Sequence, residues 1–235
     1  LNAHIDTVKP TPAWKHEPHR ASMEGDIIYG LGTNDDGASL VSLLQVFRSM
    51  QNEQLPYNLL LALSAEEEVS GKNGMEYLLT KLPKIDVALV GEPTGMHPAV
   101  AEKGLMVLDL TAHGVSGHAA RNEGDNAIYH AVEDISWLKD YRFPKESQLL
   151  GPVKMTVTIV NAGTQHNVIP SECHFTVDVR SNELYSNEDI FNTVKENVKS
   201  EVKARSFRLS SSRIDMHHPL VKKAVSLGRK PFGSP

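Results

Sequence analysis

Histidine and acidic residues lie near the ends of apolar, strand-like runs in the first hundred residues, and this pattern constrains the fold more than any other feature of the chain. The apolar runs cover residues 1–5, 59–63 and 87–90. An open α/β sheet presents its functional side chains in this way, at the carboxyl ends of its strands. The residues concerned are His4, Asp6, Asp35, Glu66, Glu67, Glu68 and Glu92.

One imidazole and several carboxylates suit a pair of divalent metal ions better than a thiolate site. If these side chains converge, they predict a metal-dependent hydrolase. The alternative is that each acid is a solvated loop charge, as most Asp and Glu residues are. A carboxylate beside an apolar strand is costly unless it is paired or metal-bound, however, so the pattern favours the metal site.

The composition narrows the class of protein. A length of 235 residues permits one large domain or two of ordinary size, and 40% hydrophobic with 23% charged residues is typical of a soluble globular protein. The net charge of −5 with scattered basic residues predicts no nucleic-acid partner. No apolar run reaches transmembrane length and there is no signal-peptide pattern, which predicts no membrane partner. The lone Cys173 excludes an internal disulfide and predicts a cytoplasmic protein.

The two ends of the sequence predict a fragment. Leu1 stands within an apolar run, and a ligand-type residue follows at position 4 with no strand before it. The last residues, Gly-Ser-Pro, follow a helix-like segment. We therefore expect both termini of the parent protein to lie outside this sequence.

Residues 1–100 predict a mainly parallel sheet with helices on its faces. The side chains of Asn34, Asp35 and Asp36 can cap a helix whose apolar stripe begins at Leu40. The continuous apolar run at 59–63 is typical of a strand buried on both faces. The remaining expected elements are a strand tail at 1–5, a helix at 74–82 and a strand at 87–90.

After about residue 100 the order of the expected elements changes. The sequence predicts strands at 105–112, 153–161, 173–180 and 207–214, with helices at 126–141 and 188–203. This β-α-β-β-α-β order is that of a ferredoxin-like sandwich. We therefore predict a metal-binding catalytic domain at residues 1–100, an inserted lid at 101–214, and a return to the first domain at 215–235.

Spacing within the motifs suggests roles for individual residues. His4 and Asp6 point to the same side of an extended segment, so the carboxylate can hold the imidazole in the tautomer that a metal needs. Asp35 follows a glycine turn and can bridge two cations with its two oxygens. Glu67 and Glu68 are adjacent and cannot face the same way, so one can bind a metal while the other addresses a bound water.

The chain resembles the M20 family of dizinc amidohydrolases, most of all its acetylornithine deacetylase and succinyl-diaminopimelate desuccinylase branch. The resemblance is carried by the segments LNAHIDTV, YGLGTNDDGAS, LSAEEEVSG, VGEPTG, HGVSGHAA, NVIPSE and VDVR. It implies a zinc-peptidase-like α/β catalytic domain with two Zn²⁺ ions, for which Co²⁺ or Mn²⁺ could substitute. It also implies that the inserted lid forms a homodimer.

The resemblance assigns the metal ligands. His4 and Glu92 would hold one metal ion, Asp35 would bridge both, and Glu68 would hold the second. Glu67 would be the general base that takes a proton from the bridging water.

The remaining assignments are one residue of the catalytic domain and three of the lid. Asp6 would support His4, and His118 would reach the partner subunit's active site and stabilise the oxyanion. Asn167 and Arg180 match positions that contact the substrate carboxylate.

Three departures from the family pattern stand out. The bridging Asp35 is followed by Asp-Gly-Ala where the family usually has x-Lys-Gly. The proline that often follows the lid histidine by a few residues is absent, with Arg121 nearby instead. We interpret both as signs of a different acyl or amine preference. The family's last metal ligand, a histidine near the C-terminus, has no match, because His217 and His218 come too early. The chain by itself is therefore expected to have an incomplete second metal site and to be inactive.

The leading functional hypothesis is hydrolysis of an N-acyl amino acid, with N-acetylornithine in arginine biosynthesis as the first substrate. N-acetyl- or N-succinyl-citrulline and N-succinyl-diaminopimelate are alternatives, as is a di- or tripeptidase or carboxypeptidase of the same family. A non-catalytic dimerisation or binding module is the alternative of another class, motivated by the missing histidine. The presence of Glu67 and four ligand-type residues argues against it.

Overall fold

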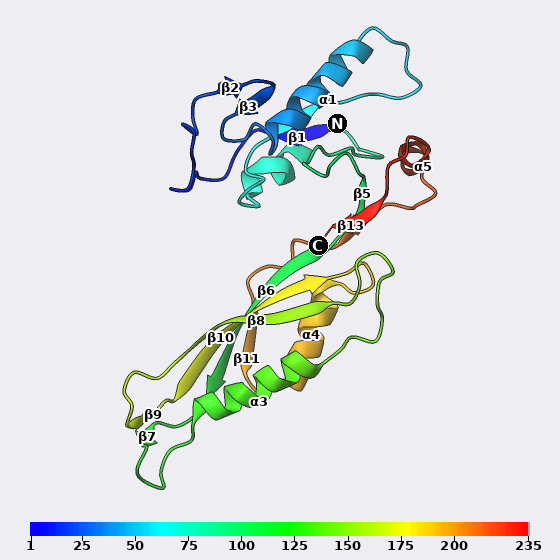
Figure 1. The fold of residues 1–235 in the computed structure, drawn as a ribbon. Coiled ribbons are helices and arrows are strands. Elements are labelled where there is room, and N and C mark those ends of the chain that lie inside the picture. The colour runs from blue at the N-terminus through cyan, green and yellow to red at the C-terminus, as the bar shows by residue number, and fades with distance from the viewer. Residues whose placement is uncertain (235) are drawn as a thin grey trace. The chain divides into compact units, whose positions relative to one another are not determined.

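The computed structural model describes residues 1–234 and divides into two compact units (Figure 1). The first unit covers residues 1–96 and the second begins at residue 97. Both combine helices with strands, so the α/β prediction is confirmed. The predicted division into a catalytic domain, a lid and a returning segment remains a prediction.

The first unit is built on short parallel strands. β1 (Asn2–His4) pairs in parallel with β4 (Ala62–Ser64), and a parallel bridge joins Asn2 to Val90. Three chain segments thus lie side by side with their carboxyl ends at one edge. Three predicted metal ligands, His4, Glu68 and Glu92, lie at or shortly after these ends.

Helix α1 (Gly37–Met50) begins one residue after Asp36, but the predicted capping by an acidic side chain is wrong. Asp36 makes no side-chain cap and is 1% exposed. Its Oδ2 atom instead accepts the backbone N–H of His4 at 3.2 Å. The buried backbone N–H of His4, at the end of β1, needs an acceptor. The Asp36 carboxylate serves this N–H and does not cap α1.

Other elements of the first unit differ from prediction. The strand expected at 59–63 starts three residues later, and 87–90 contributes only the bridge at Val90. A hairpin of β2 (Ser22–Glu24) and β3 (Ile27–Tyr29) was not predicted. The helix expected at 74–82 is a π-helical turn, η1 (Lys72–Glu76), followed by the short α2 (Tyr77–Leu79). Gly74 lies outside the helical region, which interrupts a longer helix.

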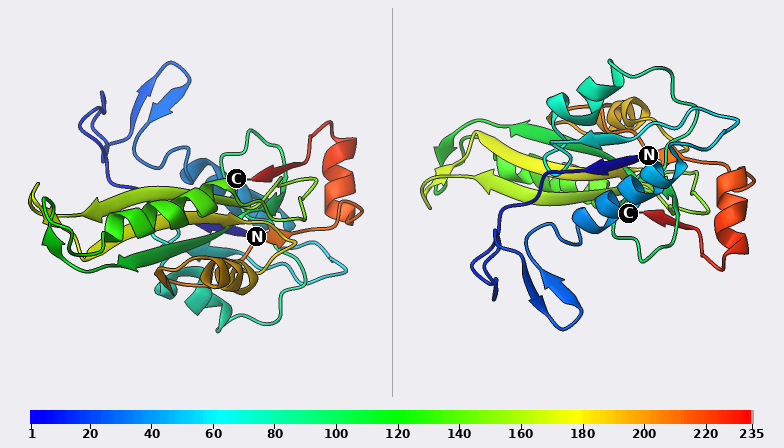
Figure 2. Two further views of the ribbon diagram at one scale, coloured as in Figure 1. Left: turned by 90° about the horizontal axis from the view of Figure 1, so that it is seen from below. Right: turned by 90° about the horizontal axis from the view of Figure 1, so that it is seen from above.

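The second unit contains the predicted β-α-β-β-α-β order. Its four-stranded antiparallel sheet has the strand order β11-β6-β10-β8. The strands are β6 (Gly104–His113), β8 (Lys154–Ala162), β10 (Glu172–Ser181) and β11 (Glu201–Ala204), and the helices are α3 (Ala127–Asp140) and α4 (Asn187–Asn197). Figure 2 shows these helices and strands from two further sides. We call this sheet and its two helices the lid.

Alternate residues of β6 and β10 form the lid core. Every second residue of each strand is buried, and both helices contribute to the same cluster. Fully burying one large apolar side chain contributes roughly 1.5–3 kcal/mol, so this core can hold the lid together. The lone Cys173 is 0% exposed within it, as a packed thiol should be. The largest members are Met106, Leu108, Leu110, Leu138, Phe175 and Ile190.

The end of the lid differs from the sequence prediction. The helix expected over 188–203 ends at Asn197, and β11 supplies the fourth strand that was expected at 207–214. The buried carboxylate of Asp134 accepts the backbone N–H groups of Lys199 at 3.0 Å and Ser200 at 2.8 Å. This contact from α3 turns the chain out of the helix and into the sheet.

A second, three-stranded sheet completes this unit. It has the order β12-β5-β13 and consists of β12 (Ser212–Arg213), β5 (Ala99–Glu102) and β13 (Phe232–Ser234). Helix α5 (Pro219–Ser226) buries Val221. A small sheet pairs β7 (Gly117–His118) with β9 (Val168–Ile169).

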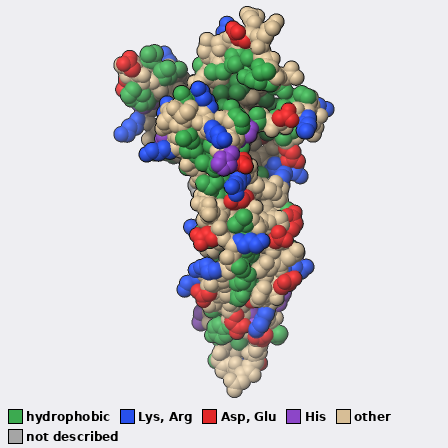
Figure 3. Space-filling model, turned by 90° about the vertical axis from the view of Figure 1, so that its right-hand side faces the viewer, with side chains coloured by type: hydrophobic (Ala, Val, Ile, Leu, Met, Phe, Trp, Pro, Cys, Tyr) green, Lys and Arg blue, Asp and Glu red, His purple; other side chains and the backbone are tan. Residues whose placement is uncertain are grey.

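Charges of both signs are interspersed on the face of the molecule in Figure 3, with no broad area of a single sign. No helix within residues 1–234 is both long enough and apolar enough to cross a membrane.

Candidate metal centre

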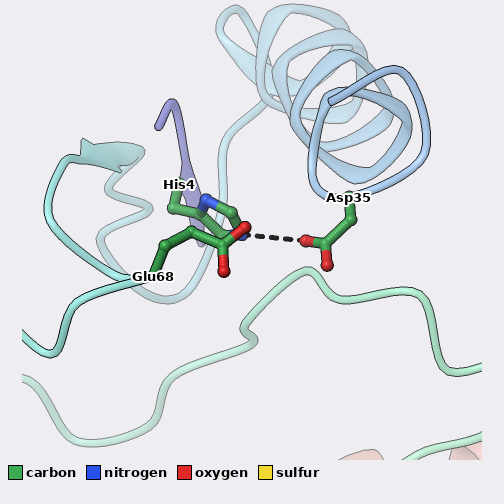
Figure 4. A group of neighbouring side chains, drawn as sticks. All are labelled: His4, Asp35 and Glu68. Carbon is green, nitrogen blue, oxygen red and sulfur yellow. Dashed lines mark hydrogen bonds and ion pairs between the residues drawn. The ribbon is translucent and has the colours of Figure 1, made fainter. Parts of the chain in front are cut away.

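The first unit brings together the predicted ligands His4, Asp35, Glu68 and Glu92 and the predicted base Glu67. His4 ends β1, Asp35 precedes α1, and Glu68 lies in the loop after β4 (Figure 4). One ligand atom from each of these three lies within 4.8 Å of the others. A second trio, of His4, Glu67 and Glu92, meets the same limit. His4 belongs to both trios, so the two groups form one cluster.

The imidazole of His4 is held in the orientation that a metal ligand needs. His4 is 3% exposed, and its Nδ1 atom lies 2.9 Å from the carbonyl oxygen of Asp6. A carbonyl oxygen only accepts, so Nδ1 carries the proton and Nε2 faces the carboxylates. The Nε2 atom is 3.1 Å from Asp35 Oδ1 and 4.0 Å from Glu92 Oε1.

The pKa of His4 is raised by its neighbours. Burial is the largest single influence and lowers it, but the Asp6 carbonyl, the Asp35 carboxylate and the charges of Glu67 and Glu92 together outweigh burial. The ring therefore holds a second proton, on Nε2, more tightly than a free imidazole does. A bound cation would take the place of that proton.

The carboxylates carry excess negative charge. Burial, followed by repulsion from Glu68, Asp6 and Asp35, raises the pKa of Glu67 against the opposing effect of His4. Burial and the charge of Glu67 are the largest influences that raise the pKa of Glu92, to about 7. A divalent cation would relieve this repulsion, and the N and O donors suit zinc, manganese or cobalt.

Asp6 connects the two ligand-bearing segments. Its two carboxylate oxygens accept the backbone N–H groups of Glu67 and Glu68, each at 3.2 Å. Its carbonyl oxygen accepts from His4, while its side chain is 3.5 Å from His4 Nδ1. The carboxylate that was expected to hold the imidazole thus also fixes the loop after β4.

Sequence reasoning missed the role of Asp36. Its carboxylate holds the backbone of His4, and its Oδ1 atom has no hydrogen-bond partner within the described residues. The sequence shows only that an extra acid follows Asp35. No local pattern indicates that this acid is buried against β1.

The lid histidine, His118, lies at the end of β7 and is exposed. Its Nδ1 atom accepts the backbone N–H of Ala120 at 3.1 Å, and its own N–H donates to Glu123 Oε1 at 3.1 Å. Since Nδ1 acts as an acceptor, a neutral His118 carries its proton on Nε2. The ring can therefore donate a hydrogen bond from Nε2.

The two predicted carboxylate-binding residues lie at opposite ends of the lid. Asn167 is beside His118, because its carbonyl oxygen accepts the N–H of Ala119 at 3.0 Å. Arg180 is near the far end of β10. About eight strand residues separate this end from Glu172, or roughly 26 Å at ~3.3 Å per residue. Asp178 already pairs with Arg180 at 2.9 Å.

The late histidines, His217 and His218, belong to the second unit. His218 Nδ1 accepts the N–H of Leu220 at the start of α5, and the N–H of His217 donates to Asp215.

Comparisons with known proteins find matches for both units of the chain. The peptidase dimerisation domain of the M20 family matches residues 100–206, and peptidase family M28 matches residues 1–92. The chain is 28% identical over 221 residues to a succinyl-diaminopimelate desuccinylase of Dinoroseobacter shibae, covering 88% of this chain and 58% of that protein. It is 28% identical over 188 residues to an acetylornithine deacetylase of Proteus mirabilis, covering 77% of this chain and 49% of the deacetylase.

A solved structure supports the fold. A tripeptidase from Staphylococcus aureus superposes with a TM-score of 0.70 at 21% identity, covering 100% of this chain and 66% of the tripeptidase. Together these matches show a mixed α/β fold like that of M20 peptidases, with a peptidase dimerisation domain in the second unit. The chain is similar to M20 peptidases in fold and to enzymes named desuccinylase and deacetylase in sequence. It spans about half the length of the curated relatives it matches.

We expect Asp6→Ala to lower metal affinity about 10–100-fold, as loss of a residue that orients ligands typically does. The substitution removes the acceptor for the N–H groups of Glu67 and Glu68. Competition with a chromogenic chelator measures the affinity. Glu53→Ala, an exposed acid after α1, is the control and should bind metal as the parent chain does. Unchanged affinity in Asp6→Ala would contradict the role of Asp6.

We expect Glu92→Gln to stabilise the metal-free chain more at pH 8 than at pH 5. The pKa of Glu92 is raised from 4.5 to about 7 in the folded chain. Such a group favours folding while protonated, and this contribution is lost as the pH rises from about 4.5 through 7. Thermal unfolding in a chelator measures the difference, with Glu53→Gln as control. Equal effects at the two pH values would contradict the raised pKa.

Proposed function

We propose that this chain carries the metal site and lid of an amidohydrolase that cleaves the amide bond of an N-acyl amino acid. The observation that supports it most is the convergence of His4 with the carboxylates of Asp35, Glu67, Glu68 and Glu92. The carboxylates repel one another around one buried imidazole, and a bound cation would offset this repulsion. The similarity to M20 peptidases supports the reaction class, which is hydrolysis.

The proposed roles follow from the position of each residue. His4 and Glu92 would hold one metal ion, Asp35 would bridge, and Glu68 would hold the second. Zinc is the first metal to test, with cobalt and manganese next. A metal ion at such a site lowers the pKa of a bound water towards ~7 and polarises the scissile carbonyl.

Glu67 is the proposed general base. Its backbone N–H donates to the Asp6 carboxylate, which holds it in the loop after β4. Burial and neighbouring charges raise the pKa of its side chain. A carboxylate with a raised pKa accepts a proton more readily near neutral pH. Glu67 would take a proton from the attacking water and deliver it to the leaving amine.

His118 is the proposed oxyanion donor. The N–H of Ala120 occupies its Nδ1 atom, so its Nε2–H is free to donate. An oxyanion that develops on the scissile carbonyl needs such a donor, and loss of one typically costs about 10²–10³ in rate. This tautomer supports the role.

The lid supports a homodimer as the working form. His118 and Asn167 lie at one end of the lid and Arg180 at the other, so one lid cannot place all three around one small substrate. Two lids can. β8 is a nine-residue edge strand, and the exposed Tyr129 and Val132 lie on the neighbouring α3. An open edge beside apolar side chains suits pairing with a second copy.

The substrate proposal begins with two compounds. N-acetylornithine and N-succinyl-diaminopimelate are both substrates to test, because the two enzyme names occur among the relatives. Acyl-citrullines and short peptides are the next candidates. A non-catalytic binding module is the remaining alternative, and it would bind metal or substrate without turnover.

We expect metal-dependent release of acetate or succinate from these substrates, and loss of about 10²–10⁴ in kcat with Glu67→Gln. Metal binding should persist in this variant, because the amide replaces only the proposed base. A product assay with a metal titration tests the proposal in the full-length protein. Absence of turnover on any N-acyl amino acid, with metal bound, would contradict the amidohydrolase.

We expect partial activity when His118→Ala and Glu67→Ala proteins are mixed and allowed to exchange subunits. If His118 acts across the dimer, one mixed site retains an intact Glu67 and an intact His118. The test compares the hydrolysis rate of the mixture with the rate of each variant alone. Mixing two samples of the same variant is the control. No gain on mixing would place His118 in its own subunit's site.

A further inference from the structure

We propose that Glu66 is a positioning residue that sets the direction of Glu67 and Glu68. The inference rests on the proposed function, because it explains how that site is held. Glu66 precedes the proposed base and belongs to neither trio of metal-ligand atoms. Its carboxylate instead closes the loop that follows these two residues.

The backbone of Glu66 has an unusual conformation. Its φ angle is +59°, in the left-handed region that few residues other than glycine adopt. This conformation turns the chain immediately before Glu67. Such a residue persists where the surrounding contacts hold it in place.

Three hydrogen bonds hold Glu66. Oε2 accepts the backbone N–H of Asn73 at 3.0 Å, and Oε1 accepts the Asn73 side-chain amide at 3.2 Å. The carbonyl oxygen of Glu66 accepts the N–H of Gly71 at 2.8 Å. Both carboxylate oxygens are therefore directed to the loop, and not to the metal cluster.

Two glycines leave the space that this arrangement needs. A Cβ atom on Gly71 would lie 2.1 Å from Glu66 Oε2. A Cβ atom on Gly74 would lie 2.1 Å from the carbonyl oxygen of Ala65. The loop can close over the Glu66 side chain only because both positions lack a side chain.

Glu67 and Glu68 are thus fixed on two sides. Asp6 holds their N–H groups from the β1 side, and Glu66 anchors the chain before them to the loop at 71–73. Adjacent carboxylates must point in different directions to serve as base and ligand. The anchored turn at Glu66 determines which direction each one takes.

Three substitutions separate the carboxylate from the backbone conformation. Glu66→Gly accepts a φ of +59° without strain but lacks the carboxylate. Glu66→Gln keeps an oxygen that can accept from Asn73. Gly71→Ala leaves Glu66 in place but adds a Cβ atom where its carboxylate lies. Glu53→Gly, an exposed acid of the same unit, is the matched control.

We expect Glu66→Gly and Gly71→Ala to lower metal affinity about 10–100-fold, with a similar loss of kcat and a KM within about threefold. Glu66→Gln should restore most of the metal affinity. The double variant should bind metal no more weakly than Gly71→Ala alone, because both changes break the same contact. Competition with a chromogenic chelator, without substrate, gives the affinities.

Metal affinity within twofold of the parent protein in Glu66→Gly would overturn the proposal. Equal losses in Glu66→Gln and Glu66→Gly would also overturn it, since the acceptor oxygen would then be irrelevant. The proposed function can fail separately. If no N-acyl amino acid is hydrolysed but metal affinity still falls in Glu66→Gly, the positioning role stands and the reaction is wrong.

Discussion

The crowding of carboxylates around one imidazole is the constraint on which the rest of the first unit depends. Asp35, Glu67, Glu68 and Glu92 approach His4 from three segments that are distant in the sequence. Burial of Glu92 and the charge of Glu67 raise the pKa of Glu92, and a bound cation would oppose both effects. Such a cation would stabilise the cluster and link the three segments, which would couple metal binding to the local fold.

The acids in and around the metal cluster divide into two groups with different physical roles. One group faces the cluster and can bind a cation. The other, formed by Asp6, Asp36 and Glu66, accepts backbone N–H groups from the segments that carry the ligands. Each of these three lies within two residues of a proposed ligand or base. Rigid backbone at a metal site keeps the ligand atoms in place when the metal leaves or substrate enters.

The lid has a core of its own, which fixes the spacing between the polar residues at its two ends. Its sheet and two helices bury alternate residues of β6 and β10, and the polar residues of interest lie at the ends. A packed sheet holds His118 and Arg180 at a fixed separation, which a flexible linker could not do. The proposed dimer uses this separation, because each substrate would meet the two ends of different lids.

Periodicity and strand-end position are local properties, so the sequence predicted the parallel start of the first unit, the order of elements in the lid and the residue types of the metal cluster. It did not predict that Asp36 holds His4, that Asp134 binds the chain just after α4, or that Glu66 adopts a left-handed backbone. Each of these depends on a hydrogen bond to a residue elsewhere in the chain. The sequence records which groups can donate or accept, but the partner that each buried group finds is decided when the chain folds.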